Sequence, residues 1–252
     1  MRNSSPYKVL TRQQPSRRQS ILSFILLIST LFIAGISEAA IRPASATGDS
    51  QHSAPVLSQM LQHALFLYAT GDYRHAQQEL IPLAQQGIAE AQFYLGSLYD
   101  SGMGITQNLA LAAHWYKRAA KNGHVEAQYN MGAAFANGEG VQHSPVNAVR
   151  WWRKAAFNGS VNAQFNLGIM YLHGNKGINP DPGEAALWWS KAAAQGDPVA
   201  QYNLGALYAN GEGVSQDIDV ALTWWSRAAE QGFQQAITSM ENFKKYLATS
   251  PH

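Results

Sequence analysis

The sequence predicts an all-α protein in which antiparallel helix hairpins stack into an α-solenoid. Two motifs recur in phase and predict this fold. The first, Ala-Gln followed by an aromatic residue, begins at Ala91, Ala127, Ala163 and Ala200. The second, an aromatic pair followed by Ala-Ala and glycine, begins at Trp115, Trp151, Trp188 and Trp224. Repetition every 36 or 37 residues, with apolar residues at helical spacing, is typical of stacked helical repeats.

Residues 1–40 have the features of a signal peptide. An acid-free basic region that ends at Arg17 and Arg18 precedes an apolar run over residues 21–36, and small residues follow it. Ser37-Glu38-Ala39 is one candidate cleavage site and Ala44-Ser45-Ala46 is another. The apolar run of 16 residues is shorter than the roughly 20 that span a bilayer. We therefore expect export to the periplasm or secretion, with an uncleaved inner-membrane anchor through residues 21–36 as the alternative.

The elements before the regular repeats are a linker and a shorter hairpin. Residues 41–55 are rich in Ser, Ala and Pro and lack periodicity, which predicts a flexible linker. Residues 56–87 place Ala64 and Tyr68 before Gly71, and Ala76 and Leu80 after it. This spacing predicts a tetratricopeptide-like helical hairpin that caps the array.

Four repeats follow, at residues 89–124, 125–160, 161–197 and 198–233. In each repeat a glycine loop, such as the one at Gly138, separates two amphipathic helices. The second helix has a capping residue before it in every repeat: Asn108, Ser144, Asp181 and Asp217. The aromatic pairs lie on the alanine stripe of this helix, so both members are predicted to face the core. Residues 234–247 are predicted to form a capping helix, and residues 248–252 a tail.

Composition excludes several kinds of chemistry. The chain has no cysteine, which removes disulfides, thiolate metal sites and a cysteine nucleophile. Residues 41–252 contain 13 Lys and Arg against 15 Asp and Glu, so the basic charge belongs to the leader and no nucleic-acid partner is expected. The histidines are scattered, and no catalytic or phosphate-binding motif is present in the predicted mature chain. We predict no metal, no cofactor and no enzymatic activity.

The repeated pattern resembles that of the Sel-one-like repeat family, relatives of tetratricopeptide repeats. The second repeat fills the key positions of the pattern with Ala127, Gly132, Phe135, Gly138 and Trp151, and the fourth does so with their counterparts. The resemblance implies a right-handed superhelix whose first helices line a concave surface. It also implies a role as an adaptor.

The candidate binding site is a column on the first helices of the repeats. Its members are Asn130, Asn166 and Asn203, with Tyr94 in the first repeat, flanked by Tyr129, Phe165 and Tyr202. Asparagine is a mediocre helix former, so its return in mid-helix suggests a ladder of amides for a peptide backbone. The alternative, equally weighted, is that these amides form hydrogen bonds between adjacent repeats, because buried amides need partners.

The predicted function is that of a non-enzymatic adaptor of the bacterial envelope or secreted space, which binds a protein or peptide segment on its concave face. Membrane contact is expected only through an uncleaved leader. One alternative is an envelope hydrolase or binder that acts on peptidoglycan or β-lactams. Another is a secreted effector that engages host proteins.

Overall fold

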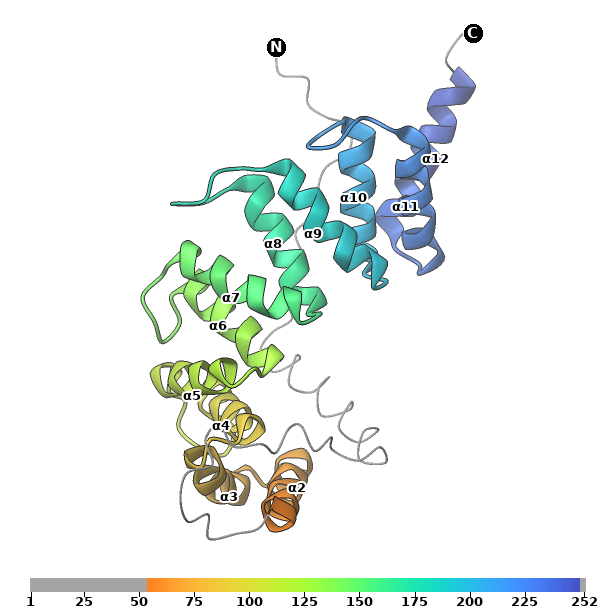
Figure 1. Cartoon of the computed structure of the whole chain (residues 1–252). Helices are drawn as coiled ribbons and strands as arrows, with labels where there is room; N and C mark the ends of the chain where they lie inside the picture. Colours follow the sequence, from red (N-terminus) through yellow and green to blue (C-terminus); the bar gives the residue numbers. More distant parts are fainter. Residues whose placement is uncertain (1–53, 250–252) are drawn as a thin grey trace. The chain divides into compact units, whose positions relative to one another are not determined.

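The described chain consists of α-helices joined by short loops. The computed structural model describes residues 54–249, and within them it contains eleven helices and no strand (Figure 1). The helices are α2 (Ala54–Thr70), α3 (Tyr73–Gln85), α4 (Ala89–Ser101), α5 (Leu109–Lys121), α6 (Val125–Asn137), α7 (Pro145–Phe157), α8 (Val161–His173), α9 (Pro182–Ala194), α10 (Pro198–Asn210), α11 (Ile218–Glu230) and α12 (Gln234–Thr249). The predicted all-α fold of helix hairpins is confirmed. The predicted signal peptide and residues 41–53 of the predicted linker lie outside the described residues, and α2 begins two residues before the predicted hairpin.

The chain divides into two compact units, with the boundary inside α7. The N-terminal unit covers residues 54–154 of the described chain, and the C-terminal unit covers residues 155–249. In the N-terminal unit each helix from α2 to α6 packs against the next. In the C-terminal unit the same holds from α8 to α12. Packing between consecutive helices is how a solenoid builds a continuous core, because no single hairpin can bury its own apolar face.

The helix boundaries follow from caps that the sequence encodes. The predicted starts of the second helices are confirmed, since Asn108, Ser144, Asp181 and Asp217 each accept a hydrogen bond from the backbone N–H three residues on. The side chain of Asp217, for example, accepts from Val220 N at 2.9 Å. At the other end of a hairpin's first helix, Gly138 adopts a left-handed conformation with φ 75°. A residue with a Cβ would be strained there, which explains the glycine in the loop.

A glycine and a bulky ring hold the two helices of each repeat together. Gly96, Gly132, Gly168 and Gly205 lie at the same place on the first helices, and each faces one ring of the second helix: Tyr116, Trp152, Trp189 and Trp225 respectively. A Cβ at Gly205 would lie 2.6 Å from Trp225 Nε1. The absence of a side chain therefore lets the helix backbone approach the ring. The ring N–H of Trp225 donates to the carbonyl of Tyr202 at 3.1 Å, which fixes its orientation.

The aromatic pairs do not all face inward, and this part of the sequence prediction was wrong. The second member of each pair is buried, but Trp115, Trp151 and Trp224 are only partly buried. A cation one helical turn on covers each of them, for example Lys154, whose Nζ lies 4.6 Å from the ring centroid of Trp151. This cation–π contact stabilises a ring that projects from the core toward solvent.

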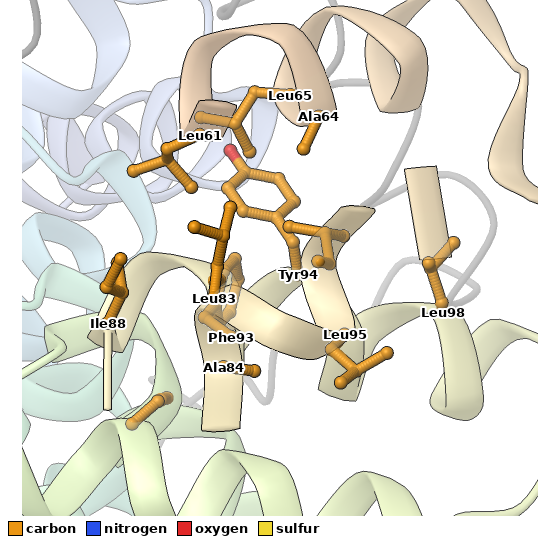
Figure 2. Packing of buried hydrophobic residues seen from close by; sticks show 14 of the residues in the cluster. Leu61, Ala64, Leu65, Leu83, Ala84, Ile88, Phe93, Tyr94, Leu95 and Leu98 are labelled. Atoms are coloured by element: carbon orange, nitrogen blue, oxygen red, sulfur yellow. The ribbon is translucent and has the colours of Figure 1, made fainter. Parts of the chain in front are cut away.

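The N-terminal hairpin covers one end of the first repeat. In Figure 2 the ring of Tyr94 projects from α4 toward Leu61 and Leu65 of α2. The Tyr94 ring also meets Tyr68 edge-on, with centroids 4.8 Å apart. The hairpin thus closes the apolar end of the array, as the sequence predicts for a cap.

Candidate functional site

The predicted site residues fall into two groups by exposure. Tyr129, Asn130 and Asn166 are partly exposed. Tyr94, Phe165, Tyr202 and Asn203 are buried, and Asn203 has 0 % exposed surface. A buried side chain presents no atoms to an incoming segment, so only the first group is accessible to one. The binding role itself stays a prediction.

Tyr94 belongs to the core beneath α2. Its burial raises the pKa of its hydroxyl well above the ordinary tyrosine value, because the phenolate would lose its hydration. The negative charge of nearby Glu90 also raises the pKa of Tyr94. The sequence placed Tyr94 in the asparagine column by register alone; it predicted the hairpin over residues 56–87 but not that α2 packs on this ring.

Asn130 connects two repeats. Its side chain hydrogen-bonds the hydroxyl of Tyr116, which lies on α5 of the preceding repeat. Burial raises the pKa of Tyr116 well above its usual value, and the bond from Asn130 opposes that shift. This contact between adjacent repeats is of the kind that the structural alternative predicts, and both roles stay predictions. An amide has both a donor group and an acceptor group, so one such bond does not use its full capacity.

A second polar column, of glutamines, was missed by the sequence analysis. Gln92, Gln128, Gln164 and Gln201 are all buried, and each donates from Nε2 to the carbonyl oxygen eight residues earlier, at 2.9–3.2 Å. In three of these glutamines the side-chain oxygen also accepts a hydrogen bond. The donor is the side-chain amide of the residue that caps the C-terminus of the second helix in the same repeat. The donors are Asn122 for Gln92, Gln195 for Gln164 and Gln231 for Gln201. The signal was present, because glutamine follows alanine in all four motifs and Asn or Gln precedes each closing glycine.

The first helix of each of the two central repeats has its own exposed stripe. On α6 it consists of Glu126, Asn130, Ala133 and Asn137, and on α8 of Asn162, Asn166, Ile169 and His173. The spacing of four, three and four residues places each set on one helix face. All eight residues are at least partly exposed. Each unit therefore presents its own strip of amides and small or apolar side chains.

The comparison with protein families identifies the repeats. The model of the Sel1 repeat matches residues 89–124, 125–160, 161–197 and 198–233, which together make up more than half of the chain. The chain belongs to the Sel1 repeat family. Sel1 repeat proteins are generally protein-interaction scaffolds, and their fold is typically non-catalytic. No curated protein matches the sequence.

Solved Sel1 repeat structures resemble this chain over most of its length. A Sel1 repeat protein from Oxalobacter formigenes is 34 % identical, with a TM-score of 0.66, over 74 % of this chain and 55 % of that one. A protective antigen of uropathogenic Escherichia coli with an SLR fold is 42 % identical, with a TM-score of 0.59, over 62 % of this chain and 33 % of the antigen. This chain thus spans about a third to about half of the length of these two relatives.

The described part of this Sel1 repeat protein contains no group of three His, Asp or Glu side chains that could hold a metal ion. His124, whose side chain is 8 % exposed, serves the fold. Its Nδ1 accepts from Ala127 N at 3.2 Å at the start of α6, and its ring stacks on Phe93 with centroids 4.2 Å apart. Among the described helices, none is both long and apolar enough to cross a bilayer.

Proposed function

We propose that this Sel1 repeat protein is a non-enzymatic adaptor of the bacterial cell envelope or secreted space, and that it binds an extended segment of a partner protein. The exposed stripes on α6 and α8 carry the proposal. Asn130 and Asn166 are partly exposed there, whereas their equivalents Tyr94 on α4 and Asn203 on α10 are buried. Amide side chains supply both donors and acceptors, which is what an extended peptide backbone requires.

Ile169 and Asn166 allow a sharp test in the C-terminal unit. A photoreactive amino acid at Ile169, in the middle of the α8 stripe, should form a cross-link to one discrete partner in living cells. The same amino acid at Leu187, which is exposed on α9, is the matched control. A cross-link of equal strength from both positions, or none from Ile169, would contradict the proposed face.

The variant Asn166→Ala separates binding from folding. Alanine is the better helix former by up to about 0.7 kcal/mol, so the variant should keep its helical circular dichroism. The yield of the Ile169 cross-link should nevertheless fall, because the amide is lost. Ser190→Ala on α9 serves as the control and should leave the yield unchanged. An unchanged yield in Asn166→Ala would remove this amide from the site.

The proposed compartment needs its own experiment. The signal-peptide features of residues 1–40 motivate it. Fractionation into periplasm, membrane and medium, with the N-terminus of the mature protein sequenced, should find a processed chain outside the cytoplasm. An unprocessed chain in the cytoplasm would contradict export.

A further inference from the structure

The outer faces of α5 and α7 are strongly basic. Six cations project from them: Lys117, Arg118 and Lys121 on α5, and Arg150, Arg153 and Lys154 on α7. Neither helix contains an Asp or a Glu. Among the described residues no carboxylate forms an ion pair with any of the six. We call these six residues the basic face, and it lies wholly within the N-terminal unit.

Four of these six cations are not required for the repeat to fold. The Arg118 and Lys154 column recurs as Lys191 and Arg227 and covers a tryptophan in every repeat. The other columns do not recur as cations. The equivalents of Lys117 and Arg153 in the last two repeats are Ser190 and Ser226, and those of Lys121 are Ala194 and Glu230. Arg150 is replaced by Leu187 and Thr223. Since the same fold forms with neutral or acidic residues at these places, Lys117, Lys121, Arg150 and Arg153 are not there to build the repeat.

Contacts within the N-terminal unit connect α7 and the loop before it to α5. Trp151 of α7 packs against the apolar cluster that contains Tyr116 and Ala119 of α5. The loop before α7 also touches the start of α5, where Gly140 approaches the backbone of Leu109. Lys121 lies three and four residues after Arg118 and Lys117, and Arg150 lies three and four residues before Arg153 and Lys154, so the cations of each helix lie toward one side of it. Each helix therefore presents its three cations on one side, and all six are at least partly exposed.

We propose that the basic face binds the surface of an anionic phospholipid bilayer. The sign of the charge fits phosphate headgroups, and six cations on two helices of one unit suit a plane that presents many phosphates. Trp115 and Trp151 lie beside the cations and are partly exposed, while Leu111 on α5 is 39 % exposed. Indole rings and the aliphatic stems of Lys and Arg are favoured at the membrane interface. This contact is independent of the adaptor stripe on the first helices and of any anchoring by the leader.

The charges set the size of the expected effect. Each Lys or Arg near an anionic surface strengthens binding by about fivefold at low ionic strength. Removal of four such charges should weaken binding by several hundredfold. The contact should also weaken as salt is added, because screening shortens the reach of each charge.

The test is co-sedimentation of the protein, purified from cells that express the full chain, with phospholipid vesicles. One set of vesicles contains phosphatidylglycerol and phosphatidylcholine, and the other contains phosphatidylcholine alone. The test variant combines Lys117→Ser, Arg153→Ser, Lys121→Ala and Arg150→Thr, which are residues that the later repeats already use at these places. The control variant changes the exposed Arg74, Lys176, Lys244 and Lys245 to Gln, and so loses the same net charge elsewhere.

The proposal expects the wild type and the control to bind phosphatidylglycerol vesicles, and the test variant to lose most of that binding while its circular dichroism is unchanged. Equal binding to both kinds of vesicle by the wild type overturns it. Equal loss in the control overturns it too, because the effect would then reflect net charge alone. Tighter binding to a DNA duplex or to an acidic peptide than to the anionic vesicles would assign the basic face to another class of partner.

Discussion

The glycine under each ring of the repeat can be tested by adding one methyl group. In Gly205→Ala the new Cβ would lie 2.6 Å from Nε1 and 2.7 Å from Cδ1 of Trp225, and 3.0 Å from the carbonyl oxygen of Ala221. Trp225 has no exposed surface, so its ring has no free space into which to move. Either the ring leaves its rotamer or the two helices of the fourth repeat separate.

The expected magnitude is a sum of three contributions. Overpacking of a filled core costs about 1–3 kcal/mol. Displacement of the ring also weakens the hydrogen bond from Trp225 to the Tyr202 carbonyl, which contributes about 1 kcal/mol. Alanine recovers up to about 1 kcal/mol of helix propensity relative to glycine. We therefore expect Gly205→Ala to lower the free energy of unfolding by about 1–3 kcal/mol.

The assay is urea unfolding followed by circular dichroism and tryptophan fluorescence. Gly183→Ala is the matched control, because that glycine is also helical and its Cβ would meet only Asp181 Oδ1 at 3.3 Å and Gly213 O at 3.5 Å. The control should be neutral or slightly stabilising. In a Trp225→Phe background, where the nearest ring atom is gone, Gly205→Ala should cost less than in the wild type. An equal cost in both backgrounds would refute the idea that the ring requires glycine.

Three further predictions concern the caps, the glutamines and the buried tyrosines. Asp217→Ala should destabilise the protein by about 1 kcal/mol in the same urea assay, because the N–H of Val220 loses its acceptor, whereas Asp217→Asn should retain most of the stability. Gln164→Leu should cost about 1–3 kcal/mol, because it leaves the Ala156 carbonyl without its buried donor; a cost no larger than that of a surface substitution would show that water replaces the amide. Burial raises the pKa of Tyr68 to about 12 and that of Tyr116 well above 10, so the folded state holds these protons more tightly than the unfolded chain does. Their contribution to stability is intact below about pH 10 and falls as the pH rises toward the folded-state pKa values, by about 1.4 kcal/mol per pH unit for each tyrosine. Urea unfolding at rising pH, with tyrosinate absorbance as the probe, tests this, and ionisation of these tyrosines near pH 10 in the folded protein would contradict it.

The sequence predicted those features that depend on local chemistry. Asp217 starts a helix because its carboxylate accepts from the next turn, and Gly138 ends one because it tolerates a positive φ, so both could be assigned from residue type and spacing. Contacts between distant segments were beyond that reasoning. The burial of Tyr94 depends on how α2 packs over α4, and the donor role of Gln164 depends on where the carbonyl of Ala156 lies in the folded chain. The recurrence of the glutamine pointed to a shared role, but its partner followed only from the folded geometry.

In a repeat protein, comparison of equivalent positions distinguishes residues that the fold requires from residues that could serve binding. A side chain that returns in every repeat with the same contact is required by the stack, as the glutamine that follows alanine is here, with its bond to the preceding helix. A binding role therefore has to rest on positions where the repeats differ while the backbone does not. Lys117 and Ser190 occupy the same place on second helices, so the difference between them has no structural cause within the repeat. The asparagine column is the harder case: Asn130 shares the register of Asn203 but differs from it in exposure, and its bond to Tyr116 already serves the stack. By this criterion the cations of the basic face are stronger candidates for a specific partner than the asparagines are.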